Sequence, residues 1–211
     1  MLRKKKSFTM LSMVLTMILA LFIPSLNPAF AATNDTPNPA PKFTKTEVQQ
    51  MVKESEAIFP YVKKDNGVFV VDSEKARQNG VSEKLIKDTE NGFAELNQKL
   101  NQNKLRTLGS CGGVSKTVST SSGRTVYLNS CEANELSYAL AIKSGVTAAV
   151  AAVISPIVPA GIAGAIVAAT LGVASATVGY YNSYGDGVKI YYKEYWVVWQ
   201  FQYTYDYMRS Q

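Results

Sequence analysis

A stretch of 42 residues without a charged side chain, from Ser144 to Gly185, restricts the folds open to this chain. Alanine, glycine, valine and isoleucine dominate it, and Pro156 and Pro159 divide it in two. We expect two helices, over 132–154 and 160–180, because proline interrupts a helix and the apolar residues leave no polar face. A helix of about 20 residues is roughly 30 Å long, close to the hydrocarbon thickness of a bilayer.

Small residues recur every four positions in the second expected helix, which gives it a face that a neighbouring helix can approach closely. Two interpretations stay open. Residues 144–180 engage a target bilayer, or they form the buried core of an exported domain. The residues assigned to membrane engagement are Ile162, Gly164, Ile166, Ala168, Leu171, Gly172, Val173 and Ala176.

The N-terminus has the pattern of a secretory signal peptide. Arg3 and three lysines precede an uncharged run rich in leucine, isoleucine and methionine, and Ala29-Phe30-Ala31 supplies the small residues of a cleavage site. We expect cleavage after Ala31, so that 1–31 is a signal peptide and the protein is secreted, extracellular or associated with the cell envelope. An uncleaved membrane anchor is the alternative.

Charge and cysteine content agree with export. The chain has 22 basic and 16 acidic residues, and the leader holds four of the basic ones, so the mature chain carries 18 minus 16, or +2. This balance gives no reason to infer a nucleic-acid partner. Cys111 and Cys131 are the only cysteines. In an oxidising compartment we expect them to form a disulfide, the alternative being two buried thiols.

Residues 32–43 contain three prolines among small polar residues and predict a flexible linker. Residues 44–109 follow as a charged, mainly helical unit. We expect helices over 44–58 and 82–103, the second interrupted near Asn91-Gly92, and a short strand over 68–71. Composition changes at Gly109, so we place a domain boundary there and treat 110–211 as a second, disulfide-containing domain.

The second domain is expected to begin with a β-hairpin, over 114–118 and 124–128, which the disulfide clamps. A strand over 188–192 follows the helices, with a reversal near Lys193-Glu194. Aromatic residues then alternate with polar ones from Tyr195 to Tyr207, which predicts a half-buried strand. Its aromatic face either covers the apolar helices or forms an interfacial belt at a membrane, and the belt residues are Tyr195, Trp196, Trp199, Phe201 and Tyr203.

Catalytic chemistry is not indicated. The chain has no histidine, which removes Ser-His and Cys-His nucleophilic mechanisms and most zinc sites. No phosphate-binding glycine loop is present, because the glycines of the apolar segment are not followed by Lys-Ser or Lys-Thr. We therefore expect a protein without enzymatic activity, cofactor or metal.

Three segments resemble a loose group of secreted Gram-positive proteins that includes large bacteriocin-like proteins. They are Phe69–Ala76 with Gly80-Val81-Ser82, Thr125–Cys131, and the Ala/Gly-rich helices with their aromatic tail. The resemblance implies an antimicrobial function.

Together these patterns predict an α+β fold: an N-terminal helical unit, a disulfide-clamped β-hairpin, an apolar helical hairpin and a C-terminal antiparallel strand pair. The leading hypothesis is a secreted, membrane-active, non-enzymatic protein of bacteriocin or toxin type, whose partner is the bilayer of a target cell. The alternative is an extracellular or cell-envelope binding module with a protein or glycan partner.

Overall fold

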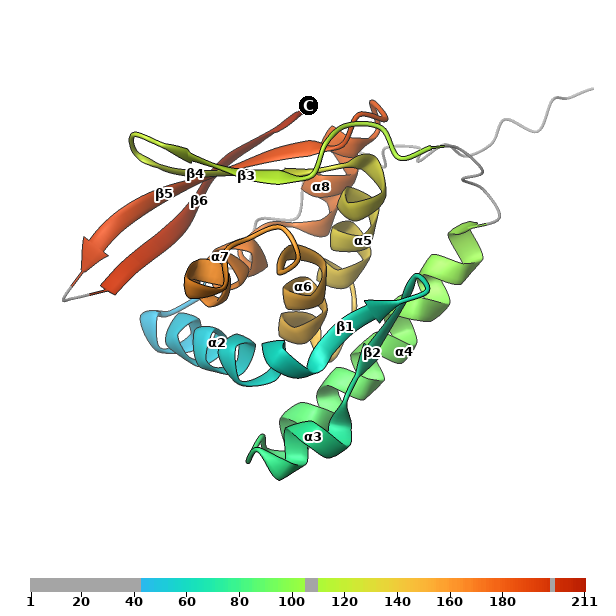
Figure 1. The fold of residues 1–211 in the computed structure, drawn as a ribbon. Coiled ribbons are helices and arrows are strands. Elements are labelled where there is room, and N and C mark those ends of the chain that lie inside the picture. Colours follow the sequence, from blue (N-terminus) through green and yellow to red (C-terminus); the bar gives the residue numbers. More distant parts are fainter. Residues whose placement is uncertain (1–42, 105–109, 198–199) are drawn as a thin grey trace, which may run out of the picture. The chain divides into compact units, whose positions relative to one another are not determined.

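The computed structural model describes residues 43–104, 110–197 and 200–211, and these have an α+β fold (Figure 1). The predicted signal peptide, the linker up to residue 42 and Trp199 lie outside the described residues. The elements before residue 105 are α2 (Lys45–Ile58), η1 (Phe59–Tyr61), β1 (Val62–Asp65), β2 (Val68–Val71), α3 (Ser73–Gln78) and α4 (Glu83–Lys104). Those after residue 109 are β3 (Lys116–Thr120), β4 (Gly123–Leu128), α5 (Ser130–Leu140), α6 (Val146–Ile154), α7 (Ala160–Leu171), α8 (Ser175–Asn182), β5 (Val188–Val197) and β6 (Gln200–Ser210).

Local capping signals set several boundaries. Thr44 and Glu47 form a reciprocal capping box at the start of α2, and Asp72 accepts a hydrogen bond from the backbone N–H of Lys75 at the start of α3. Asn66 and Gly67 both have positive φ and join β1 to β2 in an antiparallel hairpin. The helix and strand predicted over 44–58 and 68–71 are confirmed.

Helix α4 continues without a break through Gly92, so the predicted interruption there is wrong. Gly92 is buried, and a Cβ added to it would lie 2.4 Å from the carbonyl oxygen of Ser144. Gly145 has a φ of +63°, and a Cβ added to it would lie 2.3 Å from the carbonyl oxygen of Asp88. Both glycines are therefore needed for close approach of α4 to the 141–145 loop.

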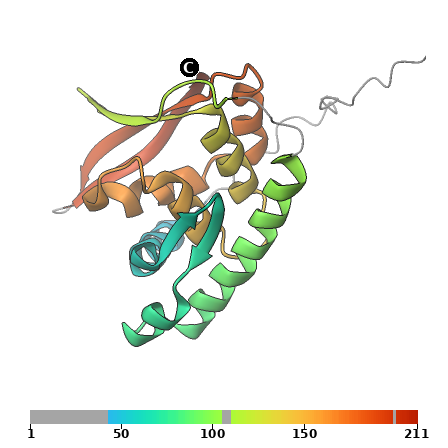
Figure 2. The ribbon, with the colours of Figure 1, turned by 45° about the vertical axis from the view of Figure 1, so that its right-hand side comes forward.

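The four-stranded antiparallel sheet has the order β3-β4-β5-β6, and α5 to α8 are inserted between β4 and β5 (Figures 1 and 2). The predicted β3–β4 hairpin is confirmed, with Lys116 opposite Tyr127. The reversal predicted near Lys193-Glu194 is wrong, because β5 extends to Val197, opposite Gln200 of β6. Ten residues of one strand thus pair with the C-terminal strand.

A β-bulge between Tyr191 and Tyr192 divides the aromatic residues of β5 and β6 between two faces. Tyr191 lies opposite Tyr207, whereas Tyr192 lies opposite Tyr205, so β6 has one extra residue at this point. Tyr203 is 6% exposed and faces the helices, whereas Tyr207 is 39% exposed. The prediction of one aromatic face from Tyr195 to Tyr207 is therefore wrong, since the bulge reverses the alternation.

Each long helix predicted for the apolar segment is two shorter helices. The first is divided into α5 and α6 by residues 141–145, which end at the left-handed Gly145. The second is divided into α7 and α8 after Gly172, which is the C-cap of α7. The small residues at intervals of four consequently do not share a face throughout: Gly164 and Ala168 are buried in α7, whereas Ala176 in α8 is exposed.

Residues on both sides of 105–109 contribute to one hydrophobic core. Ile58, Phe69, Phe93 and Leu96 from the first part belong to the same buried cluster as the apolar side chains of α6, α7 and the inner face of the sheet. The rings of Phe69 and Phe93 are 5.9 Å apart between centroids. The segments predicted as separate units, 44–109 and 110–211, thus share their core.

The packing at Gly92 generates a stability prediction with a matched control. Replacing Gly92 by Ala should lower the free energy of unfolding by about 2 kcal/mol, because the added methyl group meets a backbone oxygen. Gly161→Ala, also within a helix but with no atom within 4 Å of the added Cβ, should raise it by about 0.5 kcal/mol. Urea unfolding measures both, and equal effects of the two substitutions would contradict this packing.

Candidate functional site

The candidate site is the apolar segment of α6 to α8 together with the elements that cover it. Every residue of α6 from Thr147 to Ile154 is buried. Helix α6 contacts α2, α4, α5, α7 and β1, so it is enclosed by elements from both parts of the chain. A helix with no polar face requires such enclosure when it is folded in water.

The structure shows where each predicted membrane-engaging residue lies. Ile166 is fully buried, and Gly164, Ala168, Leu171 and Val173 are buried as well. Ile162 and Gly172 are partly exposed, and Ala176 is exposed. In this folded state most of the predicted set is core.

In the part of the chain that the structure describes, no helix by itself has the length and apolar composition of a membrane span. Helices α7 and α8 have that length and composition only when taken together, and the chain bends by 98° at the break between them.

Helix α2 covers α7 at Gly164. A Cβ added to Gly164 would lie 2.9 Å from Cγ of Glu56, and the helices therefore approach closely over the small residue. A cavity of about 110 Å³ remains between them, lined by Ser55, Phe59, Ala163 and Val167 among others. The contact thus combines one close approach with incomplete packing beside it.

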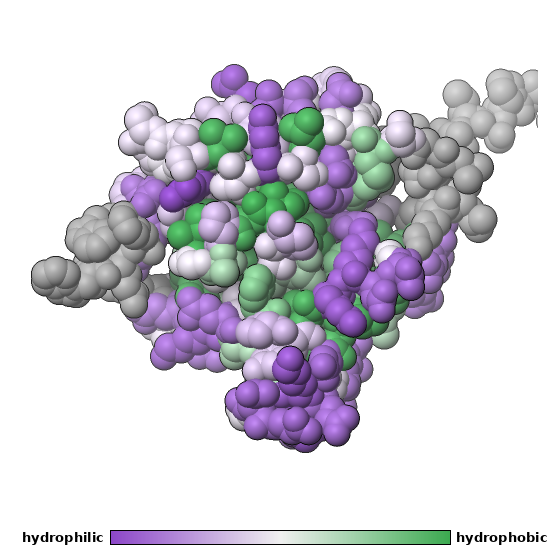
Figure 3. Space-filling model, in the orientation of Figure 1, coloured by the Kyte–Doolittle hydropathy of each residue, from purple (hydrophilic) through white to green (hydrophobic). Residues whose placement is uncertain are grey.

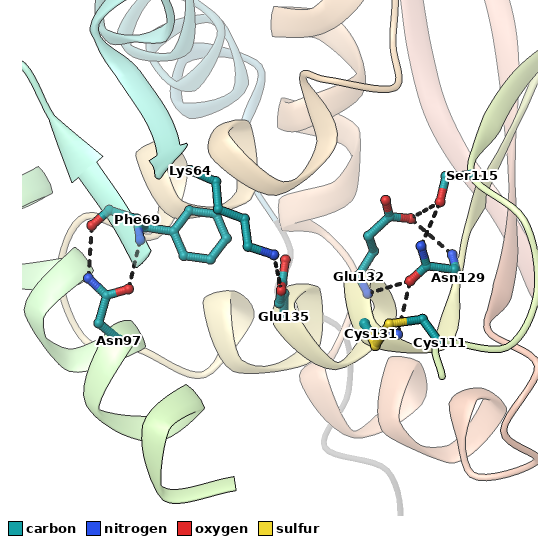
Figure 4. Close-up of polar contacts among 9 residues, drawn as sticks. All are labelled: Lys64, Phe69, Asn97, Cys111, Ser115, Asn129, Cys131, Glu132 and Glu135. Carbon is teal, nitrogen blue, oxygen red and sulfur yellow. Dashed lines mark hydrogen bonds and ion pairs between the residues drawn. A yellow bond between two sulfur atoms is a disulfide. The ribbon is translucent and has the colours of Figure 1, made fainter. Parts of the chain in front are cut away.

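A chain of polar contacts leads from α4 to α5 through β2 and β1 (Figure 4). The side chain of Asn97 in α4 accepts a hydrogen bond from the backbone N–H of Phe69 and donates one to its carbonyl oxygen, both at 2.8 Å. The ammonium group of Lys64 lies 5.5 Å from the centre of the Phe69 ring and forms an ion pair with Glu135 in α5. This ion pair links the N-terminal elements to the apolar helices.

Glu95 of α4 makes a second link. It accepts a hydrogen bond of 3.2 Å from the backbone N–H of Lys143, in the loop between α5 and α6. This hydrogen bond and a second one from Lys99 lower the pKa of Glu95, because both favour the charged carboxylate. A lowered pKa means that the link stabilises the fold at neutral pH and weakens as the pH falls through that pKa.

A groove of about 600 Å³ lies beside the Lys64–Glu135 pair. Phe59, Val62, Val153 and Pro156 give it apolar walls, and Lys63 is among its charged residues. Figure 3 shows hydrophobic surface exposed on this side of the molecule, between the sheet above and α2 and β1 below. The volume of the groove falls in the range of small-ligand sites.

The disulfide between Cys111 and Cys131 is confirmed, and it fixes the chain before β3 to the first turn of α5. Asn129 caps α5 by accepting hydrogen bonds of 3.0 Å from the backbone N–H groups of Cys131 and Glu132 (Figure 4). The carboxylate of Glu132 accepts from the Asn129 backbone and from the Ser115 hydroxyl. Glu132 is therefore a capping residue, consistent with its position at the helix N-terminus.

The predicted belt residues are not one surface. Tyr195 is exposed and Tyr203 is buried, with a hydroxyl that has no hydrogen-bond partner within the described part of the chain. Trp196 and Phe201 lie opposite each other in the β5–β6 register, and Trp199 lies outside the described residues. Of these residues, Tyr195 and Tyr203 therefore lie at the same end of the sheet but on different faces.

Sequence patterns did not identify Lys64, Glu135 or Asn97. Their partners are distant in sequence, 71 residues apart for Lys64 and Glu135 and 28 for Asn97 and Phe69.

Among the described residues, no group of three or more metal-binding side chains is clustered. Comparisons with protein-family models, curated proteins and solved structures found no match.

The ion pair between Lys64 and Glu135 can be tested by neutralising both residues. A double-mutant cycle with Lys64→Gln and Glu135→Gln should give a coupling free energy of about 0.5 kcal/mol, because Lys64 is partly exposed and solvent screens the pair. Amide exchange in β1 should accelerate. Neutralising Lys84 and Asp88, a pair within α4, should leave exchange in β1 unchanged. No coupling, or the same acceleration from both pairs, would contradict a link between β1 and α5.

Proposed function

We propose that this is an exported, non-enzymatic, membrane-active protein of bacteriocin or toxin type, in which residues 144–180 engage a target bilayer. The observation that carries the proposal is a contrast of charge between two packed layers. Residues 144–185 have no charged side chain, and 44–104, which cover α6 and α7, have ten basic and ten acidic ones. The cover gives the segment a water-compatible exterior.

The covered segment can enter hydrocarbon at low cost. Its backbone N–H and C=O groups are mostly satisfied within helices, and it would bring no ionised side chain into the bilayer. The fully buried hydroxyl of Thr170 is already bonded, because it donates to the carbonyl oxygen of Ile166 at 2.7 Å, within α7. Spanning a bilayer requires the 98° bend between α7 and α8 to open, because these two helices have the length of a span only when taken together.

Release requires the N-terminal layer to separate from α6 and α7. The polar contacts that hold this layer to α5 and the 141–145 loop are few and partly exposed, and they include the Lys64–Glu135 pair and the Glu95–Lys143 hydrogen bond. Alanine contributes many of the buried core residues of α6 and α7, alongside valine and isoleucine, and alanine has little side-chain surface. We infer that a bilayer replaces this cover.

A disulfide between α2 and α7 tests the release directly. In the variant with both Glu56→Cys and Gly164→Cys the two positions are close enough for a bond, because Cγ of Glu56 lies 2.9 Å from a Cβ at 164. The oxidised double variant should lose at least tenfold in the rate of dye release from anionic liposomes, whereas each single variant should retain it. Peptide mapping must confirm the new bond together with the native Cys111–Cys131 bond.

Two outcomes would contradict the membrane-active function. The first is that the unmodified protein causes neither liposome leakage nor growth inhibition at micromolar concentration. The second is that the locked variant releases dye as fast as the single variants, which would show that α7 acts without leaving α2.

The groove beside Lys64 favours a second candidate, an extracellular or cell-envelope binding module. Its apolar walls are formed partly by α6, which would then be a permanent core element. A protein or glycan partner would bind between the charged rim at Lys63 and the apolar floor at Val153 and Pro156.

Hydrogen exchange separates the two candidates. The membrane-active function predicts that amides of 146–171, protected in buffer by burial, exchange in a different pattern when anionic vesicles are added. The binding module predicts the same strong protection with and without vesicles. Amides of β4 and β5 serve as the internal control, because the sheet stays folded in both cases.

A further inference from the structure

The outer face of the sheet has an unusual composition. The inner face, which the helices cover, carries Val126, Ile190 and Met208, which are buried. On the opposite face, residues in register across four strands are Lys116, Tyr127, Lys189 and Arg209, and the next row contains Tyr191 and Tyr207. We call these six residues the basic–aromatic face.

The basic row is continuous from one edge of the sheet to the other. Lys116 of β3 lies opposite Tyr127 of β4, which lies opposite Lys189 of β5, which lies opposite Arg209 of β6. Neighbouring strands are about 4.8 Å apart, so the row extends over roughly 14 Å. Three cations are thus presented along one line.

The charge of this face is not neutralised by carboxylates. Within the described residues, no ion pair involves Lys116, Lys189 or Arg209, and beside the face Lys193 pairs with Asp206 at 2.9 Å. The face therefore has three basic residues and no acidic one, and its net charge is +3. The mature chain as a whole has only +2, so this face carries a concentration of positive charge that is balanced elsewhere.

The tyrosine rings are held by one another and by the cations. Tyr191 and Tyr207 are stacked with centroids 4.1 Å apart. Arg209 lies over the ring of Tyr207 at 5.2 Å, and Lys116 over the ring of Tyr127 at 5.0 Å. At least one face of each ring is therefore occupied, which disfavours stacking of nucleic-acid bases on these tyrosines.

We propose that the basic–aromatic face docks this protein on the surface of an anionic lipid bilayer. Its cations match headgroup phosphates, and tyrosines with an apolar body and a polar edge suit the headgroup region. The inference rests on the proposed function in that both need a bilayer, but it concerns binding rather than permeabilisation. Docking would place α7, which packs on the inner face through the Thr170–Tyr192 hydrogen bond, about 10 Å from the membrane surface.

Vesicle sedimentation with the purified protein tests the docking surface. On vesicles of phosphatidylglycerol and phosphatidylcholine in equal amounts, the combined variant Lys116→Gln, Lys189→Gln and Arg209→Gln should bind roughly 100-fold more weakly, at about fivefold per basic residue. Arg209→Gln alone should give the fivefold loss. The matched control is Lys53→Gln, Lys75→Gln and Lys87→Gln, three exposed lysines of α2, α3 and α4, which should bind like the unmodified protein.

Each outcome has a defined meaning. Binding lost only in the face variants supports the proposal, and equal losses in the control overturn it in favour of a nonspecific charge effect. No binding of the unmodified protein to anionic vesicles, or tighter binding to single-stranded polynucleotide than to vesicles, also overturns it. Dye release is measured in parallel. Binding without leakage supports the docking surface and contradicts the proposed function. Leakage that persists in the face variants supports the proposed function and contradicts the docking surface.

Discussion

The fold depends on enclosing α6, a helix without a polar side. In water such a helix has to be covered in all directions, and here the cover comes from both parts of the chain. Helix α6 is in contact with α7, α5, α2, α4 and β1, and the inner face of the sheet packs on α7 (Figures 1 and 2). The enclosure explains why residues on both sides of 105–109 form one core instead of two.

Local signals predicted the elements whose boundaries depend on nearby residues. Thr44 and Glu47 satisfy each other's backbone groups within three residues at the start of the helix predicted over 44–58, so the sequence pattern contains the whole interaction. The disulfide was equally predictable, because a chain with two cysteines has one possible pairing within itself. The α+β fold class follows from these elements.

The errors have a common physical origin in contacts between distant segments. Gly92 looked like a helix interruption because its partner, the Ser144 carbonyl, is invisible in the local sequence. The aromatic alternation looked uniform because a bulge is a property of two paired strands, and the pairing of Tyr191 with Tyr207 decides which rings face outward. For the same reason the candidate site was half predicted: the apolar segment was identified, but the Lys64–Glu135 link and the groove were not.

The seam between α4 and the 141–145 loop consists of main-chain atoms meeting main-chain atoms at Gly92 and Gly145. No residue with a side chain can replace either glycine at this contact, because its Cβ would meet backbone atoms. Residues on the surrounding polar surface can be replaced more freely. Relatives with little overall similarity would therefore keep this pair of glycines, the earlier in the middle of a polar helix and the later directly before an apolar one. That pairing offers a criterion for recognising them when conventional similarity has faded.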